Sequence, residues 1–200
     1  MRAHRFIRES LALRDGRKVV LRPIRPEDAP KLIELHDRLS TDSQYYRFFG
    51  PKPRLSPGEA AYLANVDFHR RFAIVAVDGD DVVAVGRFDI QPDGSAEPAI
   101  VVRDDHQGVG LGKAILERMR EVARGRGVER FSAEILAENR RMLQLMSQSG
   151  LDVNQVEEGV VRVTAPIDDL PLMFKGFRVA TRFAAEVLDR NPLRRDRQSS

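Results

Sequence analysis

Residues 101–113 of this 200-residue chain read VVRDDHQGVGLGK, and no other stretch of the sequence is as informative. An apolar run ends at Val102, glycines alternate at positions 108, 110 and 112, and an amphipathic helical pattern follows. Glycine adopts backbone dihedrals that other residues avoid and lets a ligand approach the main chain closely. The free N–H groups and the positive dipole end at the start of a helix favour phosphate. The stretch therefore predicts a phosphate-binding loop between a strand and a helix.

Two common phosphate-binding motifs do not fit this loop. A P-loop needs Gly five positions before Gly112 and Ser or Thr after Lys113, and Gln107 and Ala114 stand there instead. The dinucleotide-binding fingerprint needs a third glycine, where this chain has Lys113, and an early βαβ unit. Both nucleotide-binding folds are therefore excluded.

Strands and helices are expected on both sides of the loop. Apolar runs predict strands over 19–24, 72–77, 82–90, 96–102 and 131–135, and a hairpin over 152–165. Helical spacing predicts helices over 27–39, 45–49, 111–123, 139–149 and 176–189, and Ser56, Pro57 and Glu59 begin another. Because most strands follow one another through turns, we expect an α/β (α+β) fold with a single mixed, mostly antiparallel sheet flanked by helices.

The loop also carries a family resemblance. Gln107, Gly110 and Gly112 resemble the pyrophosphate-binding motif of the GNAT N-acetyltransferase superfamily, and the resemblance extends over residues 19–165. A closer resemblance is to the Pat-type bacterial protein lysine acetyltransferases. It rests on RLS at 38–40, YRFF at 46–49, Ala96-Glu97, the loop, RFSA at 130–133, and Asn139 with Met142. Pat-type enzymes include fusions to a cyclic-nucleotide-binding domain, and none is expected within these 200 residues.

The resemblance implies a co-substrate and a set of binding residues. Acetyl-CoA would lay its pantetheine arm along a strand backbone and its diphosphate against the loop N–H groups, without a metal. The residues expected to bind it are Ala99, Ile100, Val101, Val102, Gln107, Gly108, Val109, Gly110, Leu111, Gly112 and Asn139. The acceptor would be a protein lysine, for example on an acyl-CoA synthetase or a stress protein, attacking the thioester directly.

A base is needed for this chemistry. A lysine amine has a pKa of about 10.4, so its neutral form costs about 4.6 kcal/mol at pH 7, and a general base offsets part of that. Glu97 is the candidate catalytic residue, because it begins the strand expected to line the acetyl group and matches the carboxylate of the Pat-type enzymes. An ordinary glutamate before Pro98 is the alternative. His106 is the rival base, because imidazole titrates near neutrality, but it adjoins the loop and is expected to be a polar loop residue. His36 and His69 are expected on the surface or on a helix face.

One position departs from the family pattern. Many GNAT enzymes carry Tyr seven residues after the residue equivalent to Asn139, whereas position 146 here is Met. Either solvent protonates the leaving thiolate or no dedicated acid is needed, since a thiol pKa of about 8.5 makes thiolate an acceptable leaving group. Asn139 could equally be a helix cap. Lys113, Arg140 and Arg141 could reach phosphate, but solvated helix surface is the favoured interpretation.

Composition sets the remaining limits. The net charge of +3, from 33 basic and 30 acidic residues, does not favour a nucleic-acid partner, and the absence of Cys excludes a thiol nucleophile. No apolar run approaches the length of about 18 residues that a spanning helix needs, and we expect a cytoplasmic enzyme. We expect an N-terminal extension (1–18), an acetyltransferase domain (19–166), a C-terminal helical extension (167–190) suited to packing on the domain or a second copy, and a disordered tail (191–200). A small-molecule amine acceptor and a non-catalytic CoA-binding module are the alternative functions.

Overall fold

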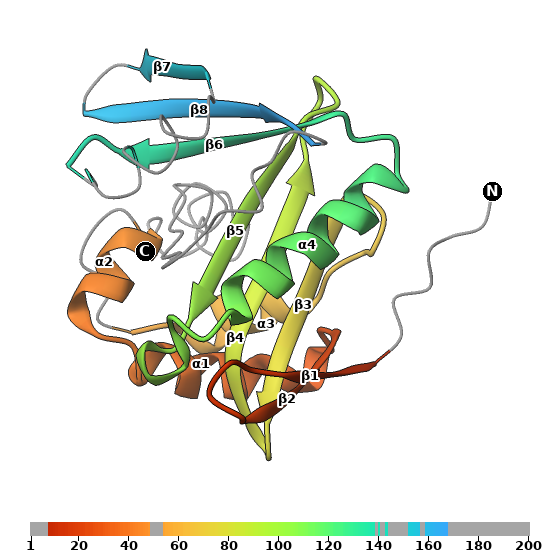
Figure 1. Ribbon diagram of the computed structural model, residues 1–200, viewed down its shortest axis with the longest axis vertical. Coiled ribbons are helices and arrows are strands. Elements are labelled where there is room, and N and C mark those ends of the chain that lie inside the picture. Colours follow the sequence, from red (N-terminus) through yellow and green to blue (C-terminus); the bar gives the residue numbers. More distant parts are fainter. Residues whose placement is uncertain are drawn as a thin grey trace, which may run out of the picture.

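The protein is built on one β-sheet with helices packed against it (Figure 1). The computed structural model describes residues 8–48, 54–138, 140, 143, 152–156 and 159–167. Within these residues, eight strands are ordered β1-β2-β3-β4-β5-β6-β8-β7. The strands are β1 (Glu9–Ala12), β2 (Lys18–Pro23), β3 (Arg71–Asp78), β4 (Asp81–Ile90), β5 (Ala96–Val102), β6 (Arg130–Leu136), β7 (Asp152–Val156) and β8 (Val160–Pro166). The helices are α1 (Ala29–Asp37), α2 (Thr41–Phe48), α3 (Pro57–Ala64) and α4 (Leu111–Arg124), with 3-10 turns η1 (Pro26–Asp28) and η2 (Asp104–His106).

The sheet is antiparallel except between β5 and β6. These two strands are parallel, and α4 forms the crossover that a parallel connection requires. Their only register pair is Ala96 with Phe131, and beyond it the strands diverge (Figure 1). The expectation of a mixed, mostly antiparallel sheet flanked by helices is confirmed, and the divergence leaves one side of β5 without a partner strand over most of its length.

The first strand lies inside the stretch expected to be an N-terminal extension. Residues 9–12 form β1 at the sheet edge and pair antiparallel with residues 18–21 of β2. The Arg118 guanidinium on α4 donates two hydrogen bonds of 2.7 Å to the Glu9 carboxylate. These bonds lower the pKa of Glu9 below its usual value, although slight burial opposes the shift. The sequence does not predict this strand because ESLA is too short and polar to give a period-two apolar pattern.

Helices cover both faces of the sheet. Helix α4 packs on one face and α1 with α3 on the other, and each face has its own buried apolar cluster. Gly86 on β4 lies in close contact with α4. A Cβ atom at Gly86 would lie 2.2 Å from Ile115 Cγ2 and 2.7 Å from Met119 Sδ, so only glycine fits there.

Two details of the helices on the α1 face bear on the sequence predictions. The start of α3 is confirmed, because the Ser56 side chain accepts the Glu59 N–H and Glu59 accepts the Ser56 N–H, a capping box. Of the two positions expected for His36, surface or helix face, the structure shows the second: the side chain is only 3% exposed and lies on a buried helix face. It lies one turn after Leu32 and therefore shares the buried face of α1. His69 is exposed, as expected.

Several predictions fall outside the described residues. They concern Asn139, most of the helix expected over 139–149, the helix over 176–189 and the tail over 191–200; Arg140 and Leu143 are helical. Among the described helices, none has the length and apolarity needed to cross a membrane.

A buried ion pair ties β2 to η1 at the start of α1. The Arg22 guanidinium donates to both oxygens of the Asp28 carboxylate at 2.6 and 2.7 Å, and the Arg25 N–H donates to it at 2.8 Å. Burial works to raise the pKa of Asp28, but these hydrogen bonds outweigh it and hold the pKa below 3.8. A carboxyl group whose pKa is lower in the folded than in the unfolded protein stabilises the fold when the pH is above its pKa in the unfolded state. This stabilisation is lost as the pH falls through its pKa in the folded state.

Asp28→Asn is therefore expected to lower the free energy of unfolding at pH 7 by about 2 kcal/mol, because a charge-assisted pair is lost and Arg22 stays half-buried. The difference from the wild type should shrink as the pH falls below 3.8. Urea unfolding at pH 7 and at pH 3 measures it. The matched control is Asp37→Asn, whose carboxylate at the other end of α1 is 58% exposed, and it should change stability by less than about 0.5 kcal/mol. A pH-independent loss for Asp28→Asn would contradict the assignment.

Candidate functional site

The loop between β5 and α4 presents a row of backbone N–H groups. Within the described chain, the N–H groups of residues 108–113 have no hydrogen-bond acceptor, whereas Ala114 N–H donates to Gly110 O at 3.1 Å. Gly108 and Gly110 have φ of 77° and 97°, in the left-handed region that favours glycine. Gly110 is the residue at the N-cap of α4 and supplies no capping side chain. These unpaired donors, together with the positive end of the α4 dipole, fit a bound diphosphate.

Gln107 is turned away from this row of donors. Its side-chain amide donates to Val102 O at 2.9 Å, with weaker contacts to Asp104 Oδ1 and Ser43 Oγ. Its backbone N–H donates to Asp104 O at 3.3 Å and completes η2. Gln107 therefore holds the loop in shape through hydrogen bonds to Val102 and Asp104. Its side chain does not join the N–H groups of residues 108–113 as a further phosphate donor.

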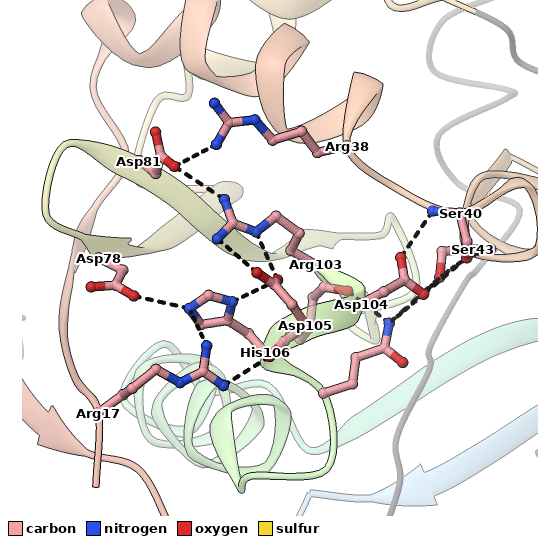
Figure 2. Close-up of polar contacts among 12 residues, drawn as sticks. Arg17, Arg38, Ser40, Ser43, Asp78, Asp81, Arg103, Asp104, Asp105 and His106 are labelled. Atoms are coloured by element: carbon pink, nitrogen blue, oxygen red, sulfur yellow. Dashed lines mark hydrogen bonds and ion pairs between the residues drawn. The ribbon is translucent and has the colours of Figure 1, made fainter. Parts of the chain in front are cut away.

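Asp104 joins the same loop to the start of α2. Its carboxylate accepts hydrogen bonds from the Ser40 N–H at 2.9 Å, the Ser40 hydroxyl at 2.9 Å and the Ser43 hydroxyl at 3.0 Å (Figure 2). A carboxylate at a helix N-terminus also interacts favourably with the helix dipole. The position of α2 is thus coupled to the phosphate loop.

His106 is a buried anchor of the loop. Its ring contacts Asp105 Oδ1 through Nδ1 at 2.7 Å, and Asp78 Oδ2 and Arg17 Nη1 through Nε2 at 3.0 Å each (Figure 2). The side chain is 2% exposed. A hydrogen bond from Arg103, together with that from His106, holds the pKa of Asp105 well below its usual value despite partial burial. Every ring nitrogen is engaged by β3, the β1–β2 turn or the loop, so the geometry supports an anchoring role for His106.

One edge of β5 faces the diverging strand β6. Hydrogen bonds from Arg103 N–H to Val83 O and from Gln91 N–H to Ser95 O flank the β4–β5 ladder and set its phase. In an antiparallel ladder alternate residues point their backbone groups to the same side. Even-numbered residues of β5 therefore direct their N–H and C=O groups toward β6. Ile100 is the central one, and no described residue pairs with its backbone.

The other β5 residues expected to bind pantetheine differ in the neighbouring strand that their backbone groups face. Ala99 and Val101 direct their backbone groups to β4, opposite Arg87 and Val85. Val102 faces β6, but its carbonyl accepts the Gln107 amide. The open backbone groups on this edge are thus those of Ile100 and the Val102 N–H.

Glu97 lies on the sheet face covered by α1 and α3. It is half-buried and pairs in register with Asp89 on β4, so the two carboxylate side chains share one face. Asp89 lies 3.5 Å from Arg71 Nε and 3.9 Å from Arg87 Nη2. Burial lowers the pKa of Arg87, and the Asp89 carboxylate opposes that shift. Two carboxylates, Glu97 and Asp89, and two guanidinium groups, Arg71 and Arg87, therefore lie close together at the edge of an apolar core.

A pocket opens on the same face. It is lined mainly by apolar side chains of α1, α3, β4 and β5, with Arg87 and His36 as its ionisable members. Of the lining residues, Val101 lies four residues after Glu97 on β5, and Arg87 lies two residues before Asp89, the register partner of Glu97 on β4. The pocket and the candidate base are thus on one side of the sheet, while α4 occupies the other.

Tyr45 makes a contact between distant segments that the sequence does not predict. Its hydroxyl donates to Glu138 Oε1 at 2.6 Å, which joins α2 to the end of β6. In the sequence Tyr45 is remote from the loop, and only the pairing of two distant elements reveals it. Lys113 Nζ lies 3.9 Å from Glu117, consistent with helix surface, and no group of His, Cys, Asp and Glu in the described residues could hold a metal ion.

The chain resembles proteins of known family. The acetyltransferase (GNAT) domain model matches residues 18–152. An acetyltransferase of Pseudomonas aeruginosa is 31% identical over 144 residues, which cover 70% of this chain and 77% of that protein. The acetyltransferase Pat of Mycolicibacterium smegmatis is 31% identical over 167 residues, covering 80% of this chain. The crystal structure of the GNAT domain of S. lividans PAT superposes with a TM-score of 0.72 at 36% identity, covering 80% of this chain and 96% of that domain. The chain spans half the length of the M. smegmatis protein.

Proposed function

Because the chain belongs to the GNAT acetyltransferase family, we propose that it transfers the acetyl group of acetyl-CoA to lysine side chains of other proteins. The activity of the family is acetyl-CoA-dependent acetyl transfer. Similarity to Pat and to the GNAT domain of S. lividans PAT supports a protein lysine as the acceptor. The observation that carries the proposal is the row of N–H groups at residues 108–113, which lies at the end of the open β5 edge.

The donor is held by backbone groups. The N–H groups of residues 108–113 would bind its diphosphate, and the α4 dipole adds to that attraction. The Ile100 N–H and C=O would pair with the amides of the pantetheine arm, as an added strand would. Backbone recognition explains why the loop needs glycine at positions with positive φ rather than a charged side chain. Acetyl-CoA supplies a thioester whose thiolate is an acceptable leaving group.

Glu97 acts as the general base in this proposal. It lies on β5, three residues before Ile100, on the face that carries the apolar pocket. A lysine amine entering beside the pocket loses a proton to the carboxylate as it attacks the thioester. This offsets part of the cost of about 4.6 kcal/mol for the neutral amine at pH 7.

The test uses a bacterial protein extract incubated with the purified chain and isotope-labelled acetyl-CoA. We expect label on protein lysines by mass spectrometry, and none with heat-inactivated protein. Label on small amines alone would replace the protein acceptor by a small-molecule one. Binding of CoA without release of thiol to any acceptor would instead indicate a binding module. Calorimetry with millimolar CoA that shows no binding to folded protein would remove the basis of the proposal.

A further inference from the structure

The turn between β1 and β2 contacts the phosphate loop directly. The Arg14 N–H donates to Val109 O at 3.1 Å, and Arg17 Nη2 donates to Asp105 O at 2.8 Å. Arg17 also contacts the buried ring of His106 (Figure 2). These contacts hold the backbone of the N-terminal hairpin against the loop, so the turn lies beside the start of α4.

The Arg14 side chain lies along Gly110. A Cβ atom built on Gly110 would be 3.7 Å from Arg14 Nε and 3.9 Å from its Cγ. Gly110 is the N-cap of α4 and stands in the middle of the row of N–H groups at residues 108–113. The Arg14 guanidinium thus adjoins the donors that the proposed function assigns to the diphosphate.

Arg14 differs from the neighbouring arginines in its charge partners. Arg17 pairs with Asp15, and Arg103 pairs with both Asp81 and Asp105. Arg38 also pairs with Asp81 (Figure 2). Among the described residues, no carboxylate or carbonyl accepts from the Arg14 guanidinium, which is exposed. Of these four arginines, three form ion pairs with carboxylates, whereas Arg14, beside the start of α4, forms none with a described residue.

We propose that Arg14 is a donor-binding residue that contacts the diphosphate of acetyl-CoA, together with the N–H groups of residues 108–113. A planar guanidinium forms two parallel hydrogen bonds to phosphate oxygens, which suits this position better than a point charge would. The inference rests on the proposed function of the loop. Arg14 lies before residue 18, outside the part of the chain that matches the family model, so this contact is additional to the glycine motif.

The test is calorimetric titration of Arg14→Ala with CoA, 3′-dephospho-CoA and pantetheine at low ionic strength. We expect the dissociation constants of CoA and 3′-dephospho-CoA to rise by about tenfold, as for the loss of an exposed charge-assisted hydrogen bond. The affinity for pantetheine should not change, and the difference between variant and wild type should decrease with added salt. Arg14→Lys should lose part of the affinity.

The matched control is Arg8→Ala, which removes an exposed arginine at the other end of β1 and should bind CoA as the wild type does. Thermal unfolding of each variant checks that the hairpin is intact. Wild-type affinity in Arg14→Ala would overturn the inference while leaving the proposed function in place. A loss confined to CoA would also overturn it, since the 3′-phosphate would then be the contact. If the wild-type protein binds no CoA, it is the proposed function that fails.

Discussion

Glu97→Gln is expected to lower the turnover number for acetyl transfer by about 100- to 1000-fold. Glutamine has nearly the same shape as glutamate but cannot accept the proton of the attacking amine. The affinity for CoA should not change, because Glu97 is not among the groups assigned to bind the donor. The residual rate should rise with pH, since the fraction of neutral lysine increases toward its pKa of about 10.4. Steady-state rates of thiol release between pH 6 and 9 measure the effect.

The control for Glu97→Gln is Glu129→Gln, which makes the same chemical change at an exposed position before β6. It should retain wild-type turnover. If Glu97→Gln binds CoA, remains folded and still turns over at the wild-type rate, Glu97 is not the base. Asp89, which pairs with Glu97 across the β4–β5 ladder, would then be the carboxylate to test on the same face.

Replacement of Gly86 is expected to produce the largest loss of stability. Gly86→Ala should lower the free energy of unfolding by about 2 kcal/mol and Gly86→Val by about 3 kcal/mol. The reason is the close approach of α4 to β4. The added Cβ would overlap Ile115 Cγ2, and this methyl group sits on a β-branched, fully buried side chain that cannot rotate aside. Equilibrium unfolding in urea measures the difference.

Gly58→Ala is the matched control for Gly86→Ala. Gly58 lies in the first turn of α3, and a Cβ there has no atom within 4 Å, so the substitution should be neutral or stabilise by up to about 1 kcal/mol. A double variant with Ile115→Ala tests the contact itself. Its loss should be smaller than the sum of the two single losses, because removing Ile115 makes room for the new methyl group. A strictly additive double variant would contradict the steric explanation.

The phosphate loop and the elements around it are predictable because their signals are local. The apolar runs of β3, β4 and β5, the capping box at Ser56 and the glycines at 108, 110 and 112 each depend on residues that are close in the sequence. Periodicity and turn chemistry act over a few residues, so one sequence suffices to detect them.

The omissions arise where a contact joins distant segments. The sequence left His36 either on the surface or on a helix face, and it is buried on a helix face because α1 lies with this side toward β4 and β5. His106 is a polar loop residue, as expected, but the sequence does not reveal that its partners Asp78 and Arg17 come from elsewhere in the chain. The short, polar strand β1 is stabilised by its pairing with β2 and by Arg118, neither of which its own residues reveal.

By itself the sequence determined the family, the order of most strands and helices, and the presence of a glycine loop ahead of a long helix. Only the tertiary structure decided which backbone edge of β5 is open, which side chain of the N-terminal hairpin lies beside Gly110, and that Gln107 shapes the loop from inside. The physical reason is that hydrogen-bonding direction and charge neighbours depend on ladder phase and on packing between segments far apart in the chain. A local pattern fixes the conformation of each segment but not its neighbours in space.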